Sequence, residues 1–407
     1  MTRPLKLGRR SDASLIGLDI QPGFVAAVQA RVNGSIIAER AACMALPADS
    51  VRDGEVMDED AVSDALRELF GGSGLSKRVR LGVANQRTVL RTLELPPVTD
   101  AKELAAAVNF QAQDQVPMPL NNAFMDFHAL GIVDTPAGPR QRVVLVAAQR
   151  DMIERLLAAV RRAGLTPEGV DLSAFALIRS QHRRDPEQTG RVLYLNVDGL
   201  TNLAIAEGTI CRFTRVVGSG LEGMAGEIAE RRSIALTEAR ALLAAVDLNA
   251  PAPVEQALGA AAESDAQDLS DEQAPGGEPL SAEEAEESER AMSYEELAAV
   301  DSIPAAQAAQ SDADLWAVLE NGIRDISGEV RNSLDFHRSQ DGGGEVSHVV
   351  MSGAAQDIPG FAEALQRSLG VEVRLGEVGV LEQNVDETLA PHRLAIATGL
   401  ATAEAPQ

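Results

Sequence analysis

The sequence has few aromatic residues, few cysteines and no long apolar run. Only 3% of its 407 residues are aromatic although 45% are hydrophobic, so any core must consist mainly of aliphatic side chains. Cys43 and Cys211 are the only cysteines, and no CxxC pair or Cys/His cluster exists, which excludes a disulfide framework and a zinc site. No stretch approaches the roughly 20 apolar residues of a membrane span, and the polar N-terminus has no signal-peptide apolar region. We therefore expect an intracellular protein.

Basic residues are also scarce, and the charge is unevenly distributed. The chain carries 36 Lys and Arg against 61 Asp and Glu, a net charge of −25. Between Glu255 and Asp314 there are 17 acidic residues and one basic residue, Arg290. The acidic, Ala-, Pro- and Gly-rich composition of 250–312 predicts a largely disordered low-complexity insertion, and 1–13 is expected to be a disordered basic leader. The overall acidity argues against nucleic-acid binding.

Two stretches of the chain are built to the same plan. Ser14–Ala41 and Arg191–Val217 each read as three short strands of aliphatic and β-branched residues joined by tight turns at matching offsets. Each stretch has a polar residue late in its first strand, Asp19 in one and Asn196 in the other. A repeat this long indicates duplicated domains, because solenoid repeats have shorter periods. We expect two similar α/β halves whose first turns face each other across a cleft.

A compact unit interrupts the first half between Arg87 and Gln149. It reads as a strand (Thr88–Leu93), a helix (Asp100–Gln115) and two further strands (Ala123–Leu130 and Arg142–Ala148). This β-α-β-β pattern is self-contained and small, so it is predicted to be an inserted subdomain. The apolar residues of its helix that are expected to face a core are Leu104, Val108 and Ala112.

Glycine-rich turns are the only motifs that suggest ligand binding. Gly218, Gly220 and Gly223 fit GxGxxG, but two helices follow them instead of the βαβ unit that a dinucleotide site needs. A phosphate contact in another fold remains open, because such a turn offers free helical N–H groups. Ser352–Ala355 lies between a strand and a helix, where packing or a ligand would explain the glycine. No P-loop, HExxH, GxSxG or nucleophile–base pattern occurs, so no catalytic residue is assigned.

The order of these elements resembles the actin-like ATPase superfamily, and in particular the PilM family of type IV pilus assembly. The segments that carry the resemblance are Leu15–Ile20, Leu90–Pro96, Asp126–Leu130, Val144–Leu172, Ser352–Phe361 and Ala395–Ala401. They cover roughly residues 14–250 and 314–403. The β-α-β-β unit resembles the 1C subdomain that PilM shares with the division protein FtsA.

The resemblance implies an α/β fold: a duplicated actin-like (RNase H-like) fold of two facing halves with a 1C-type subdomain inserted in the first. The first half is expected to comprise residues 14–86 and 150–188, with the insert at 87–149. The second half is expected to comprise 189–249 and 313–407, interrupted by the acidic insertion 250–312. The leader 1–13 precedes the first half.

The resemblance also implies an adenine-nucleotide cleft between the halves. The residues that would line it are Asp19, Gln21, Gly23, Asn196, Asp198, Gly199, Thr201, Gly218, Gly220, Gly353 and Ala354, with Asp19 holding Mg²⁺ through water. The chain departs from the family at Gln21 and Pro22, where Gly-Ser is usual, and at Ala26, where a lysine is usual. These changes remove phosphate donors, and Pro22 has no N–H. ATP or ADP with Mg²⁺ is therefore expected to bind weakly or not at all, without appreciable hydrolysis.

The family implies a scaffold role at the inner face of the plasma membrane. Its partner would be the N-terminal cytoplasmic tail of a PilN-type inner-membrane protein, held in a groove near the β-α-β-β unit, together with other proteins of the pilus platform. Two alternatives from other classes stay open. One is an FtsA-like membrane-tethering or filament-forming actin homologue, and the other is a sugar or acetate kinase of the same superfold.

Overall fold

The computed structural model describes residues 15–33, 35–136, 138–183, 190–250, 313–340, 343–381 and 389–402. The predicted basic leader and all but the first residue of the acidic insertion 250–312 lie outside these ranges. The chain divides into two compact units, a larger one of residues 1–223, 324–357 and 362–407 and a smaller one of residues 224–323 and 358–361. Within the described ranges, no helix is long and apolar enough to span a bilayer.

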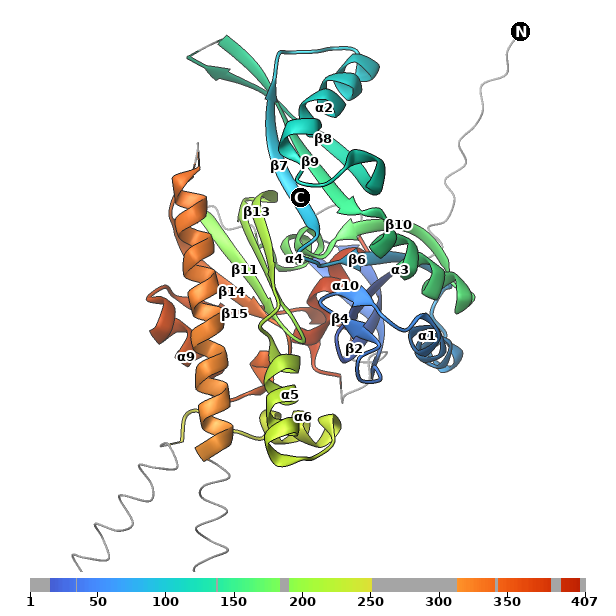
Figure 1. Ribbon diagram of the computed structural model, residues 1–407, viewed down its shortest axis with the longest axis vertical. Coiled ribbons are helices and arrows are strands. Elements are labelled where there is room, and N and C mark those ends of the chain that lie inside the picture. Colours follow the sequence, from blue (N-terminus) through green and yellow to red (C-terminus); the bar gives the residue numbers. More distant parts are fainter. Residues whose placement is uncertain are drawn as a thin grey trace, which may run out of the picture. The chain divides into compact units, whose positions relative to one another are not determined.

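The larger unit contains two sheets built on the same topology (Figure 1). The strands of the first, in sheet order, are β10 (Thr166–Leu172), β6 (Arg78–Val83), β1 (Ile16–Gln21), β2 (Phe24–Asn33), β3 (Ser35–Ala45) and β16 (Gly379–Val380). Those of the second are β13 (Ile210–Val217), β12 (Thr201–Glu207), β11 (Arg191–Val197), β14 (Val346–Ser352) and β15 (Val373–Leu375). In each, the first strand pairs antiparallel with its hairpin partner and parallel with a later strand, β6 or β14. The predicted duplication is confirmed.

Two helices lie between the sheets and share one core with both. They are α4 (Ser173–Gln181) and α10 (Ala395–Leu400), which contact Ala26 of β2 and Ala204 of β12 within one buried cluster. Gly399 of α10 is required for this packing, because a Cβ there would overlap the carbonyl oxygen of Ala176 in α4. The other face of the first sheet is covered by α1 (Glu59–Ser73) and α3 (Arg150–Arg162).

The first and last helices end differently from the sequence expectation. Asp58 caps α1 by accepting hydrogen bonds from the amides of Asp60 and Ala61. The sequence predicts a helix over Glu59–Phe70 that is closed by Gly71–Gly72. That end is wrong, because the helix continues to Ser73 and ends at Gly74, which adopts φ 65°. The sequence also predicts one final helix, Pro391–Ala403. The structure instead has a 3₁₀ turn (Pro391–Leu394) followed by α10, which ends at Leu400.

The insert, residues 87–149, has a three-stranded antiparallel sheet and one helix. Its sheet order is β7 (Thr88–Leu95), β9 (Gly138–Gln149) and β8 (Ala123–Thr135), with α2 (Ala101–Gln115) packed on one face. The predicted order of elements is confirmed, and Leu104, Val108 and Ala112 are buried as expected. The expected loop between the last two strands is replaced by a longer hairpin, in which Gly131 (φ 111°) accompanies a register shift.

The smaller unit is built around short helices. It includes most of α5 (Leu221–Arg232), all of α6 (Leu236–Ala244) and the start of a long helix over residues 313–339. Met224 of α5 packs against Gly322 of the long helix, where a Cβ would collide with the methionine side chain. The amide of Leu248 donates to the carbonyl oxygen of Pro359, 2.8 Å away.

Candidate functional site

The β1–β2 turn places a buried carboxylate and a buried carboxamide side by side. Asp19 and Gln21 are two residues apart on β1, so their side chains share a face of the strand, and they are 2% and 5% exposed. The Nε2 of Gln21 donates to Oδ2 of Asp19 over 2.6 Å. Burial raises the pKa of Asp19 to about 7; this hydrogen bond opposes the shift and the carboxylate of Asp198 adds to it. The glutamine thus partners the oxygen that would otherwise be available to a ligand.

The equivalent turn of the second half is tied to the loop after β14. Asp198 accepts at Oδ1 from the amide of Ala354 (2.5 Å) and at Oδ2 from Nδ2 of Asn196 (2.7 Å). Oγ of Ser352 donates to Oδ1 of Asn196 over 2.9 Å. Burial raises the pKa of Asp198, and the hydrogen bonds from Ala354 and Asn196 act against that rise. Asn196, Asp198 and Ser352, which could have faced a nucleotide, therefore form hydrogen bonds within the protein instead.

Glycines bring these turns into direct contact. A Cβ on Gly199 would overlap the carbonyl oxygen of Pro22, and one on Gly220 would overlap that of Gly199. Gly353 has φ 94°, and its Cβ would lie 2.6 Å from the carbonyl oxygen of Val197. The residues that meet here are called the turn cluster: Asp19, Gln21, Pro22, Gly23, Asn196, Asp198, Gly199, Thr201, Gly220, Ser352, Gly353 and Ala354.

Of the predicted nucleotide-site residues, all but one belong to the turn cluster. Thr201 is held there by its hydroxyl, which donates to the carbonyl oxygen of Ser219 over 2.6 Å. Gly218 instead lines a separate cavity beside Gln86. Asp19 is the carboxylate predicted to hold Mg²⁺, and within the described ranges no group of three His, Cys, Asp or Glu side chains forms a metal-binding set.

An apolar groove lies where the insert meets the first half. It has a volume of about 430 Å³. Its apolar walls include Phe124, Met125 and Phe127 of β8, Leu157 of α3, Val170 of β10 and Phe175 of α4. We call it the insert groove. Phe124 and Val170 each remain 39% exposed, which is unusual for large apolar side chains that already line a concave surface.

Polar groups border the insert groove without filling it. The guanidinium of Arg150 lies 4.1 Å from the ring centroid of Phe124, a cation–π contact that fixes one wall. Asp126 and Asp171 also line the groove, and Asp171 is paired with Arg179 at 2.5 Å. Sequence reasoning located the insert but not these residues. A usable signal was present, because two of the chain's nine phenylalanines, Phe124 and Phe127, fall in one predicted strand.

Part of the chain matches a protein-family model, and most of it matches a solved structure. Residues 17–198 match the family model of the type IV pilus assembly protein PilM. A structure of a PilM–PilN type IV pilus biogenesis complex matches with a TM-score of 0.65 and 19% identity, over 95% of this chain and 97% of that one. The chain is similar to PilM. The actin-like fold and the resemblance to PilM predicted from the motifs are confirmed.

More distant structures also match along most of the chain. The ethanolamine utilization protein EutJ from Carboxydothermus hydrogenoformans has a TM-score of 0.47 and 15% identity, over 98% of this chain and 90% of that one. MreB5 of Spiroplasma citri bound to AMPPNP has a TM-score of 0.44 and 11% identity, over 95% and 94%.

Proposed function

We propose that this chain is a scaffold of the type IV pilus assembly platform. In this role it binds the N-terminal cytoplasmic tail of a PilN-type inner-membrane protein and is held at the inner face of the plasma membrane through that partner. The likeness to PilM supports this assignment. The observation that carries it is the insert groove, whose exposed Phe124 and Val170 form an apolar surface that an extended or helical peptide would cover.

The insert groove has the properties of a peptide-binding site. Aromatic anchors in a concave apolar surface contribute most of the affinity in such interfaces. Phe124 is pre-oriented by its contact with Arg150, so little side-chain entropy is lost when a peptide covers it. The bordering carboxylate of Asp126 favours a tail with a basic residue beside its apolar anchors, whereas Asp171 is already paired with Arg179.

Substitution of the groove aromatics tests this function. Phe124→Ala should weaken binding of a PilN-type tail peptide about 30-fold, which corresponds to about 2 kcal/mol for loss of an aromatic anchor. Phe110→Ala is the matched control, because Phe110 is 73% exposed on α2 and does not line the groove. Calorimetric titration of the peptide into each full-length variant gives the affinities. Equal affinities for both variants would place the partner elsewhere.

The second part of the proposal is that the turn cluster no longer binds a nucleotide tightly. Three observations support it: the Gln21 amide engages Asp19, Pro22 has no N–H, and the Pro22 carbonyl packs against Gly199. The residues present therefore do not fit the phosphates of ATP or ADP. We accordingly assign no catalytic residue and expect negligible hydrolysis. Turnover of ATP near 1 s⁻¹ by pure protein would contradict this, and phosphoryl transfer to a metabolite or ATP-dependent filaments would favour the kinase or cytoskeletal alternatives.

A further inference from the structure

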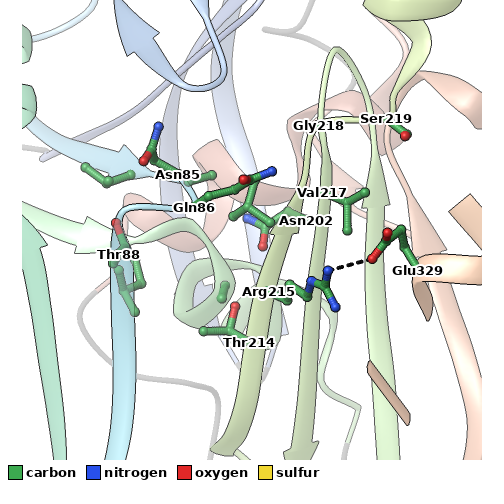
Figure 2. Close-up of a pocket in the computed structure, with 15 residues that line it drawn as sticks. Asn85, Gln86, Thr88, Asn202, Thr214, Arg215, Val217, Gly218, Ser219 and Glu329 are labelled. Atoms are coloured by element: carbon green, nitrogen blue, oxygen red, sulfur yellow. Dashed lines mark ion pairs between the residues drawn. The ribbon is translucent and has the colours of Figure 1, made fainter. Parts of the chain in front are cut away.

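A second cavity, of about 530 Å³, is lined by residues of both halves (Figure 2). The segment Val83–Gln86, which follows β6, forms one wall together with Thr88. Asn202 of β12 and the segment Thr214–Ser219, at the end of β13, form the other. We call it the β6 cavity. Gly218 is the only predicted nucleotide-site residue among the described residues that line it. The insert groove shares two apolar lining residues with it, Val83 and Leu172.

The duplication relates one wall of the β6 cavity to a segment of the second half. β6 pairs parallel with β1 in the first sheet as β14 pairs parallel with β11 in the second. The segment after β6 is therefore the counterpart of Ser352–Ala354, the segment after β14. In the second half that segment is closed, because Gly353 packs on Val197 and the amide of Ala354 is bonded to Asp198. In the first half, Asn85 of the equivalent segment bonds to Asp53 and Glu55, and the segment lines the β6 cavity.

Buried polar atoms point into the β6 cavity without partners. Asn202 is 3% exposed, and neither its Oδ1 nor its Nδ2 has a hydrogen-bond partner among the described residues. Oγ1 of Thr88, across the cavity, is also buried and unpartnered within the described ranges. Buried polar groups are normally satisfied, and one left without a partner costs stability. The volume exceeds by more than tenfold the ~30 Å³ that one water molecule occupies, so the cavity has room for a small molecule.

The charges that line the cavity cancel. Among the described residues, Arg215 and Glu329 are the only ions that line it, and they pair with each other at 2.6 Å (Figure 2). Because each ion is already paired, a charged ligand would find its counter-charge partly neutralised. An apolar molecule would leave Asn202 and Thr88 unsatisfied. None of the lining residues is aromatic, so a nucleobase would find no ring to stack on.

We propose that the β6 cavity binds a small, neutral, hydroxyl-rich molecule of the sugar or polyol class. Each ligand hydroxyl both donates and accepts a hydrogen bond, and Asn202 and Thr88 together offer an amide donor, an amide oxygen and a hydroxyl. Such a ligand satisfies both side chains without a charge of its own. It contacts β12 and β13 of the second sheet and the end of β6 in the first sheet, so its binding adds contacts between the two halves.

The test uses full-length protein and a panel of D-glucose, D-mannose, N-acetylglucosamine and glycerol, with adenosine as a neutral nucleoside. Binding is followed by thermal shift and by perturbation of the Asn202 side-chain NH₂ signal in NMR spectra. At least one sugar or polyol should bind saturably. Asn202→Leu should weaken that binding about tenfold or more, as expected for a lost donor–acceptor pair, and the isosteric Thr88→Val a few-fold.

Ser63→Ala provides the matched control. Ser63 of α1 is fully buried and its Oγ is also unpartnered within the described ranges, but it does not line the cavity, so this variant should bind as the wild type does. Thr88→Val keeps the test valid if Asn202→Leu does not fold. Two outcomes overturn the proposal. One is that no member of the panel binds, which would mean that the cavity holds only solvent, and the other is Asn202-dependent binding of adenosine without binding of any sugar or polyol.

Discussion

The turn cluster and the insert groove lie in the same unit of the chain but differ in how their side chains are satisfied. In the turn cluster, Asp19 and Asp198 are fully buried and each accepts hydrogen bonds from neighbouring protein groups. In the insert groove, Phe124 and Val170 remain 39% exposed, with no described residue covering them. A site whose polar groups are already paired gains little from a ligand, whereas exposed apolar surface gains free energy when it is covered. This difference supports the proposal that the partner binds in the insert groove and that the turn cluster has a structural role.

The largest expected effect concerns the buried carboxylate of the turn cluster. Because the pKa of Asp19 is raised to about 7, the folded chain keeps a proton that the unfolded chain loses near pH 4. The stabilising contribution of Asp19 is therefore complete below pH 4 and is lost as the pH rises towards 7. Asp19→Asn keeps an acceptor for Gln21 and does not titrate. Its stability relative to the wild type should rise by about 4 kcal/mol between pH 4 and pH 8.

Denaturant unfolding of both proteins across this pH range measures that change. A difference between the two proteins that stays constant with pH would show that Asp19 does not retain its proton on folding. The turn cluster would then be a more solvated site than its 2% exposed aspartate indicates.

The contact between the turns gives the next largest effect. Gly199→Ala places a methyl group against the carbonyl oxygen of Pro22, and the two turns must separate to accommodate it. We expect a loss of about 3 kcal/mol in the free energy of unfolding. Gly226→Ala in α5 is the control, because no atom lies within 4 Å of its added Cβ, and alanine should stabilise that helix slightly. If Gly199→Ala unfolds at the same denaturant concentration as the wild type, the turns are not tightly packed. Space for nucleotide phosphates between them would then be available.

The third prediction concerns the insert, whose hydrophobic core around α2 should be sensitive to substitution, whereas its exposed surface should not be. Val108→Ala removes two methyl groups from a residue that is 1% exposed and should cost about 2 kcal/mol. Phe110→Ala, two residues further on α2, should change stability by less than about 0.5 kcal/mol because its ring is 73% exposed. Thermal unfolding distinguishes the two variants. Similar losses in both would indicate that Phe110 is covered by another surface in solution.

Much of the fold could be predicted because it depends on local patterns. The matching turns in the two halves identified the duplication, and the alternation of strand and helix identified the insert. The end of α1 could not be placed, because Gly71 and Gly72 read as a helix stop although their Cβ positions face open space and the helix tolerates them. Only Gly74, with φ 65°, supplies the left-handed residue that ends it.

The candidate sites were predictable only in part. The spacing of Asp19 and Gln21 on one strand predicts that their side chains lie on one face, but their hydrogen bond depends on the depth of burial. Pro22 contacts Gly199, which lies 177 positions further along the chain, so no local sequence pattern predicts this contact. The insert groove likewise combines β8, α3, β10 and α4, and its shape exists only after these elements pack.

A calorimetric titration of the PilN-type tail peptide into full-length protein, with and without saturating Mg-ATP, tests the proposed partner site most directly. If the tail binds in the insert groove and the turn cluster does not bind nucleotide, as we propose, the dissociation constant should be the same in both conditions and should rise about 30-fold in Phe124→Ala. Peptide binding that requires Mg-ATP, or that is unaffected by Phe124→Ala, would contradict this proposal.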